Sequence, residues 1–244
     1  MTSTVIGAVA PRPSPPTSRF SADSAATDSR RDVLVTDLDR TFSNPDLSLN
    51  AHALATVALL REEGIVCVLA TGRWLPELPI DPLTNLFDGF VLEGGARWGA
   101  HDDLACAAGA PHVMDAASVL EAAGAQVRRR TASFSVDRHW EKTLRDMGSC
   151  SVQPNRDSID VLPLGIDKGT GVSAWLDYAG ISPRRIVAVG DGENDVPLLL
   201  RADVRIAVGN AVPQLRDVAE WTTRGECAKG FVEAVYAAFP EVFA

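Results

Sequence analysis

The chain has 244 residues, of which 46% are hydrophobic, so it can bury the core of one large domain or of a domain with a small insert. The formal net charge of −9 and the pI of about 4.9 argue against a nucleic-acid-binding surface, and any anionic substrate then needs local positive charge at its site. The four cysteines lack the short spacing of a zinc site, and their pattern fits a reducing compartment. No stretch is long and apolar enough to span a membrane. We therefore expect a cytoplasmic protein.

The first thirty residues differ in composition from the rest of the chain. Four prolines lie among Ser and Thr at 11–16, which is typical of a disordered tail over 1–30. No basic group precedes the short apolar run at 4–10, so a signal peptide is not expected. An over-long assignment of the start codon would explain the same segment equally well.

Apolar runs alternate with amphipathic segments through most of the remaining chain. Runs of β-branched and aliphatic residues predict buried strands, and apolar residues three or four apart predict helices. In chain order these are strand 33–36, helix 48–63, strand 65–70, strand 90–92, helix 169–179, strand 186–189, helix 195–201, strand 204–208 and helix 226–239. The alternation predicts an α/β fold with a Rossmann-like, mostly parallel sheet covered by helices on both faces.

Residues 97–163 break this alternation. The elements expected here are helix 111–123, strand 125–136, helix 138–147 and a hairpin over 151–164 that turns near 155–157. They predict a small α+β cap domain at 97–163, inserted into a core domain made of 31–96 and 164–244.

Acidic, hydroxyl and basic side chains follow three of the expected strands. These are Asp37 and Asp39 after the first, Thr71, Gly72 and Arg73 after the second, and Asp191, Asn194 and Asp195 after the strand at 186–189. Ligands of open parallel sheets bind beyond the carboxyl ends of the strands, so we expect these groups to meet at one edge. Lys168, at the start of a helix, can reach the same edge.

This combination of residues indicates phosphoryl transfer. Asp37 can attack phosphorus and form an aspartyl-phosphate, which divides one difficult displacement into two easier ones. Carboxylate and phosphate repel each other, and Mg²⁺ held by Asp37 and Asp191 can bridge them. Thr71 and Lys168 can stabilise the phosphoryl oxygens, and Asp39 can protonate the leaving oxygen and later deprotonate water.

Four strings in order resemble the motifs of the haloacid dehalogenase superfamily. They are DLDRT at 37–41, ATGR at 70–73, DKGTG at 167–171 and GDGEND at 190–195. Their order and spacing resemble the Cof-type and sucrose-phosphatase-like branch, in which a cap lies between the second and third motifs. The resemblance covers the chain from about residue 32 to its end.

The resemblance implies a role for each motif residue and Mg²⁺ as the cofactor. Asp37 would be the nucleophile and Asp39 the acid/base, with the Asp39 backbone carbonyl also reaching the metal. The implied phosphate- or substrate-binding residues are Thr71, Gly72, Arg73, Lys168 and Asn194, and the implied metal-site residues are Asp37, Asp39, Asp191 and Asp195.

Two positions depart from the family pattern. Arg40 stands where the family usually has Gly, and an arginine fits there without strain if its φ is negative. The run Glu93, Gly94, Gly95 stands where the family usually has Glu-Asn-Gly, which removes a side-chain amide near the site.

The expected function is Mg²⁺-dependent hydrolysis of a small phosphate monoester, a sugar or polyol phosphate, through an aspartyl-phosphate. One alternative is a phosphomutase, which needs a cap that excludes water, and the expected cap is small for that. The other is a non-catalytic binding protein. The expected partner is therefore a small phosphorylated metabolite, with no nucleic acid and no membrane, and the sequence sets no oligomeric state.

Three consecutive arginines in the expected cap carry a further expectation. Alternate positions of a strand point to opposite faces, so Arg129 should face away from the side that Arg128 and Arg130 share. Only the arginines that face the site should influence the choice of substrate.

Overall fold

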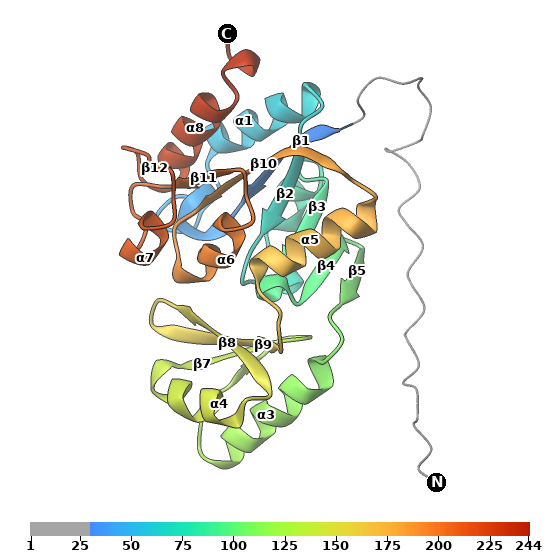
Figure 1. Ribbon diagram of the computed structural model, residues 1–244, viewed down its shortest axis with the longest axis vertical. Coiled ribbons are helices and arrows are strands. Elements are labelled where there is room, and N and C mark those ends of the chain that lie inside the picture. Colours follow the sequence, from blue (N-terminus) through green and yellow to red (C-terminus); the bar gives the residue numbers. More distant parts are fainter. Residues whose placement is uncertain (1–29) are drawn as a thin grey trace.

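The computed structural model of the chain describes residues 30–244. Apart from Arg30, the tail expected over 1–30 lies outside this part of the chain. Two layers are stacked along the long axis of the molecule: a large sheet with helices on both faces, and a small sheet whose helices lie on its outer side (Figure 1).

The large sheet has eight strands, with β1 between β10 and β2. Its order is β12-β11-β10-β1-β2-β3-β4-β5, and the pairs from β12 to β3 are parallel whereas β4 and β5 are antiparallel. The strands are β1 (Arg31–Thr36), β2 (Val66–Ala70), β3 (Gly89–Leu92), β4 (Arg97–Ala100), β5 (Asp103–Cys106), β10 (Pro183–Gly190), β11 (Val204–Ala207) and β12 (Trp221–Thr222). Every residue of β1 after the first is buried, as expected for a strand covered on both faces.

Alternate residues of β1 point to opposite faces of the large sheet and join two separate cores. Leu34 packs with α1 and α8 on one face, whereas Val33 and Val35 pack with α5 and α6 on the other. The helices of this layer are α1 (Ala51–Glu62), α2 (Ile80–Thr84), α5 (Lys168–Ala179), α6 (Val196–Leu199), α7 (Pro213–Arg216) and α8 (Cys227–Ala238). No helix in the described part of the chain is both long and apolar enough to cross a bilayer.

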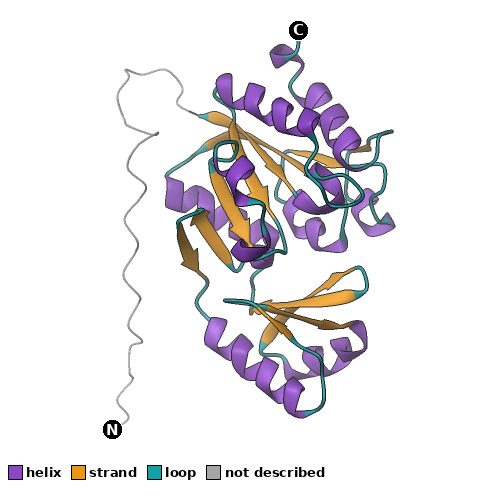
Figure 2. Cartoon of the chain, turned by 180° about the vertical axis from the view of Figure 1, so that it is seen from behind, coloured by secondary structure: helices purple, strands orange, loops and turns teal. Residues whose placement is uncertain are grey.

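The small layer, which we call the cap, is an antiparallel sheet backed by two helices. Its strand order is β6-β7-β9-β8, and Figure 2 shows this sheet turned toward the large layer, with α3 and α4 outside. The elements are α3 (Ala110–Ala122), β6 (Arg128–Arg129), β7 (Phe134–Asp137), α4 (Glu141–Met147), β8 (Cys150–Asn155) and β9 (Ser158–Pro163). Leu120, Phe134 and Leu144 belong to its own hydrophobic core.

The described chain also has six short helical turns, and three of them lie at the carboxyl ends of strands in the large sheet. All six are Leu38–Phe42, Leu75–Glu77, Glu93–Gly95, Arg138–Trp140, Glu193–Asp195 and Pro240–Val242. The turns after β1, β3 and β10 bring backbone and side chains to one edge of the sheet, and the cap covers this edge.

The fold expected from the sequence is confirmed, but two local predictions were wrong. Residues 97–106, assigned to the insert, form the β4–β5 hairpin and extend the large sheet beside β3. The single strand predicted at 125–136 is two short strands, β6 and β7. The chain turns between them, with the Arg130 N–H donating to the Ser133 carbonyl at 2.9 Å.

Candidate active site

The motif residues converge at the carboxyl ends of the central strands, as the topology predicts. Asp37 and Asp39 follow β1, Thr71 follows β2 and Asp191 follows β10, while Lys168 opens α5. The Asp37 N–H donates to the Val189 carbonyl at 3.0 Å, so the ladder between β1 and β10 continues up to this aspartate.

Lys168 joins two of the carboxylates. Its Nζ donates to Asp37 Oδ1 at 2.6 Å and to Asp195 Oδ1 at 2.5 Å. All three side chains are buried. The other oxygen of Asp195 accepts the N–H groups of Asp191 and Gly192 at 3.0 and 2.9 Å, so Asp195 also fixes the loop after β10.

The carboxylate of Asp191 accepts three hydrogen bonds from other side chains. Its Oδ1 accepts from Thr41 Oγ1 at 3.2 Å, and its Oδ2 accepts from Asn210 Nδ2 at 3.1 Å. Arg156, at the tip of the β8–β9 hairpin of the cap, donates to the same Oδ2. Asp191 thereby contacts both layers of the molecule.

Burial and crowding shift the pKa values of these groups. Burial raises the pKa of Asp37 well above its usual value, which Lys168 partly offsets and the neighbouring carboxylates reinforce. Burial, with the carboxylate of Asp195, raises the pKa of Asp191 to about 6. Burial lowers the pKa of Lys168, but Asp195 and Asp37 more than reverse this effect, so the pKa is raised and the side chain stays an ammonium.

These carboxylates suit a divalent cation. Asp37, Asp191 and Asp195 each place an oxygen within 4.8 Å of the others, and all three are buried. Two cations, Lys168 and Arg156, face these three buried carboxylates. Burial first, and then the neighbouring carboxylates, raise the pKa values of Asp37 and Asp191. Oxygen-only donors suit Mg²⁺ or a similar hard ion.

Asp39 lies beside Asp37 but has a different environment. Its carboxylate accepts two hydrogen bonds from Arg73, from Nη2 at 2.5 Å and from Nε at 2.9 Å. Its side chain keeps 36% of its surface exposed, against 7% for Asp37. One aspartate is therefore buried and the other is accessible, which suits a nucleophile and a proton carrier, respectively.

A cavity of about 480 Å³ lies over these groups, between the large sheet and the cap, and we call it the strand-end cavity. It is lined by Asp37, Asp39, Arg40, Leu47, Gly72, Arg73, Glu77, Arg128, Arg130, Asn155, Arg156, Asp191, Gly192 and Asn194. Gly72 and Asn194 are thus placed where the sequence expects them. Thr71 is fully buried and is not among the lining residues; its Oγ1 accepts the Arg73 N–H at 3.2 Å.

The three consecutive arginines divide as their alternation predicts. Arg128 and Arg130 line the strand-end cavity, whereas Arg129 donates to Glu121 on α3 at 2.9 and 2.7 Å. Arg128 donates to Glu77 of the large layer, and Arg130 donates to Asp160 of β9 at 2.9 Å.

The backbone at Arg40 differs from the sequence expectation. Its φ is +59° and its ψ is 12°, a left-handed conformation, so a negative φ is not what accommodates the arginine. Ser43 Oγ accepts the Arg40 N–H and Asn210 Nδ2 donates to its carbonyl, each at 3.0 Å.

Four further residues, to which the sequence had assigned no role, complete the site. Thr41, Arg156 and Asn210 hold Asp191. Glu93 fixes the cap, since its Oε2 accepts the Ala132 N–H at 2.8 Å and Ser133 Oγ at 3.0 Å. Thr41 and Glu93 stand in runs compared above with the family pattern, whereas Arg156 and Asn210 act through long-range contacts that no local pattern signals.

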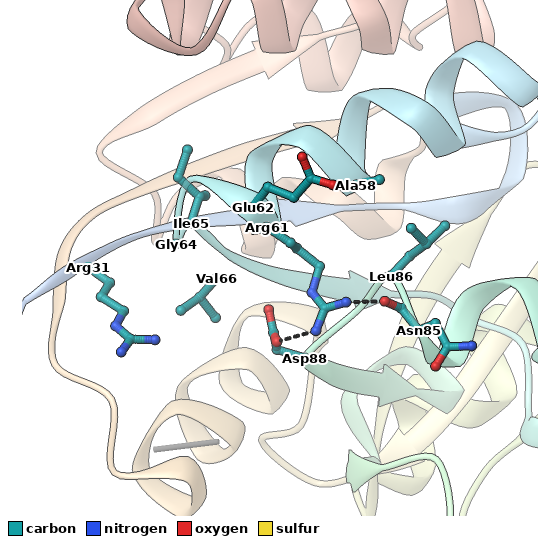
Figure 3. Close-up of a pocket in the computed structure, with 10 residues that line it drawn as sticks. All are labelled: Arg31, Ala58, Arg61, Glu62, Gly64, Ile65, Val66, Asn85, Leu86 and Asp88. Atoms are coloured by element: carbon teal, nitrogen blue, oxygen red, sulfur yellow. Dashed lines mark hydrogen bonds and ion pairs between the residues drawn. The ribbon is translucent and has the colours of Figure 1, made fainter. Parts of the chain in front are cut away.

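A second cavity, of about 460 Å³, lies at the opposite ends of the strands (Figure 3). The first residues of β1 and β2, Arg31 and Val66, line it. Arg61 there donates to Asp88 at 3.0 Å and to the Asn85 carbonyl. None of the motif carboxylates lines this cavity, so it is separate from the phosphoryl chemistry.

Comparisons with known proteins agree with this geometry. Residues 135–235 match the family of haloacid dehalogenase-like hydrolases. A phosphoglycolate phosphatase of Methanoculleus marisnigri is 30% identical over 231 residues, covering 86% of this chain and 98% of its own. Another, of Methanothermobacter thermautotrophicus, is 27% identical over 220 residues, covering 83% and 96%.

Solved structures show the same fold. A phosphatase of this superfamily from Bacteroides thetaiotaomicron has a TM-score of 0.72 at 21% identity and covers 91% of this chain and 99% of its own. The sucrose-phosphatase of Synechocystis sp. has a TM-score of 0.63 at 19% identity and covers 86% and 98%. The chain belongs to the haloacid dehalogenase-like hydrolases. Within them it is a phosphatase, a phosphoric monoester hydrolase.

Proposed function

We propose that this phosphatase hydrolyses a small phosphate monoester in two steps, with Mg²⁺ as cofactor and Asp37 as nucleophile. The observation that carries the proposal is the bridge from Lys168 to both Asp37 and Asp195, next to Asp191. The bridge fixes a buried carboxylate at a strand end and places a permanent cation against it.

In the first step an Asp37 carboxylate oxygen attacks phosphorus, and the bond to the ester oxygen breaks. Asp39 gives its proton to that oxygen, so the alcohol leaves neutral. In the second step Asp39 takes a proton from water, the water oxygen attacks phosphorus, and the bond between Asp37 and phosphorus breaks to release phosphate.

The surrounding residues hold these two aspartates in place. Arg73 donates two hydrogen bonds to Asp39 and holds the Asp39 carboxylate at the cavity wall. Lys168 orients Asp37 and neutralises charge that develops on the phosphoryl oxygens. Asp37, Asp191 and the Asp39 carbonyl would hold Mg²⁺, with Asp195 supporting them, and the ion would supply the positive charge that lets carboxylate and phosphate approach.

The substrate we propose is a small phosphorylated metabolite, in keeping with a cavity of about 480 Å³. A sugar or polyol phosphate is the class expected from the sequence. The names of the curated relatives add 2-phosphoglycolate as a second candidate, and arginines around the cavity favour it. With four free cysteines in the chain, we propose the reducing cytoplasm as its compartment.

A phosphate-release screen over phosphorylated metabolites, with and without Mg²⁺, tests the proposal. Metal-dependent release from one or a few small esters, abolished by Asp37→Asn, supports it. Conversion of a sugar phosphate to its isomer without release would indicate a phosphomutase. No turnover of any ester would leave only a binding protein.

A further inference from the structure

Five arginines line the strand-end cavity, and the protein itself engages four of them. Carboxylates hold their guanidinium groups: Asp39 holds Arg73, Glu77 holds Arg128, Asp160 holds Arg130 and Asp191 holds Arg156. The remaining one is Arg40. Its guanidinium makes no hydrogen bond or ion pair with any residue in 30–244.

The backbone of Arg40 is strained in a way that a glycine would avoid. At φ +59° an L-residue lies in the left-handed region, which glycine occupies without steric cost. Ser43 and Asn210 hold its N–H and its carbonyl, so the loop keeps this conformation whatever side chain it carries.

Arg40 is also close to the reacting groups along the chain. It follows Asp39 directly, on the short helical turn after β1, and its exposed side chain lines the same cavity as Asp37. A substrate whose phosphoryl group meets Asp37 must place its other end within this cavity. An unpartnered guanidinium in this cavity can bind a planar anion through two parallel hydrogen bonds.

We propose that Arg40 binds a carboxylate at the distal end of the substrate, so that the enzyme selects phosphate monoesters of small hydroxy acids. This inference rests on the proposed phosphatase function and names the substrate class of the same site. One unpartnered guanidinium balances one negative charge, which matches a carboxylate better than a second phosphate dianion.

A matched pair of esters tests the inference. 2-Phosphoglycolate and 2-hydroxyethyl phosphate have the same length and differ in a carboxylate against a neutral CH₂OH. We expect wild-type kcat/KM to favour the carboxylate ester by about tenfold or more, the scale of a charge-assisted bidentate contact. Arg40→Gly should abolish this preference in kcat/KM, and Arg40→Lys should retain part of it.

Stability separates a substrate contact from a structural role. Because glycine fits φ +59°, the Arg40→Gly variant should melt at the same temperature as wild type or higher. The same variant should no longer prefer the carboxylate ester in kcat/KM. Arg129→Ala is the matched control: it removes an arginine charge that faces α3, and it should leave the preference unchanged.

A binding measurement keeps the test independent of turnover. Dissociation constants of both esters, measured by calorimetry with Mg²⁺ on Asp37→Asn and on Asp37→Asn with Arg40→Gly, should show the same preference and the same loss. A preference that survives Arg40→Gly, or equal weakening of both esters, would overturn the role of Arg40. Absence of hydrolysis in wild type, with binding selectivity intact, would instead overturn the proposed function.

Discussion

Lys168 Nζ lies 2.6 Å from Asp37 Oδ1, although 131 residues separate the two in the chain. The pair forms because β1 ends at Thr36 and α5 begins at Lys168, on the same edge of the sheet. Both side chains are buried, so the ammonium acts on the carboxylate with little screening by water. We expect catalysis to depend on how this buried pair meets a phosphate ester.

The first prediction is that activity requires a divalent cation. Asp37, Asp191 and Asp195 are three buried carboxylates beside two cations, Lys168 and Arg156, so a phosphate dianion would be repelled without added positive charge. Phosphate release should vanish in EDTA and return with Mg²⁺, and Ca²⁺ should inhibit because its looser coordination misplaces the attack. Full activity in EDTA after exhaustive dialysis would contradict this.

The second prediction separates the two aspartates of the first motif. Asp37→Asn should abolish turnover, because an amide is a poor nucleophile, whereas Asp39→Asn should lower kcat by about 10²–10⁴-fold, the usual worth of a positioned acid/base. Asp102→Asn, with a side chain 74% exposed, is the control for the change of charge and should be silent. Steady-state kinetics with a generic aryl phosphate provide the measurement, and substantial turnover by Asp37→Asn is incompatible with the assignment.

The third prediction concerns the arginines of the cap. Arg128→Ala should lower kcat/KM for the true substrate, whereas Arg129→Ala should not, because Arg129 is bound to Glu121 away from the cavity. Arg130→Ala should in addition destabilise the fold, on the order of 3 kcal/mol, because it leaves the buried Asp160 without its cation. Kinetics and urea unfolding of the three variants, measured in parallel, test whether Arg128 and Arg130 act at the cavity and Arg129 does not. Equal losses in all three would show that strand alternation does not decide their roles.

The fourth prediction is a pH dependence of stability far from the site. Asp32, buried at the start of β1, accepts from Arg184 and Arg185, and these hydrogen bonds lower its pKa from the usual 3.8. A lowered folded-state pKa stabilises the fold above the unfolded pKa and loses that contribution as pH falls through the folded value.

Asp32→Asn should therefore lower the free energy of unfolding by about 1–2 kcal/mol at pH 7. This difference from wild type should shrink as pH falls below about 4, first as Asp32 of the unfolded chain takes up a proton and then as Asp32 of the folded protein does. Urea unfolding at several pH values measures it, with the exposed Asp217→Asn as control. A difference that stays constant down to pH 2 would rule out the ionised pair as its source.

The sequence was a good guide wherever local pattern decides the structure. The middle of β1, residues 33–35, is apolar and buried, and polar residues that follow such strands had to meet at one edge, so Asp37 and Asp191 could be placed in advance. Lys168 could be placed there as the first residue of a helix. The turn at 130–133 could not be placed, because the side chain of Glu93, from the large layer, holds it.

The positive φ of Arg40 and the role of Asn210 could not be predicted from the sequence either. Both depend on contacts across the fold: Asn210 binds the Arg40 carbonyl from 170 residues away. A sequence pattern reports which residues are buried and at what period, but it does not report which long-range partner a polar side chain will choose.

The central claim, a covalent phosphate on Asp37, can be tested by trapping it. With an aryl phosphate, whose phenolate leaves without a proton from Asp39, Asp39→Asn should slow mainly the attack of water, so that the phosphoenzyme accumulates in the presence of Mg²⁺. Rapid quenching with borohydride reduces an aspartyl-phosphate to homoserine, and peptide mass spectrometry then locates it. We predict homoserine at position 37 and an unchanged side chain at position 191. Turnover with no modification at position 37, or modification at another aspartate, would contradict it.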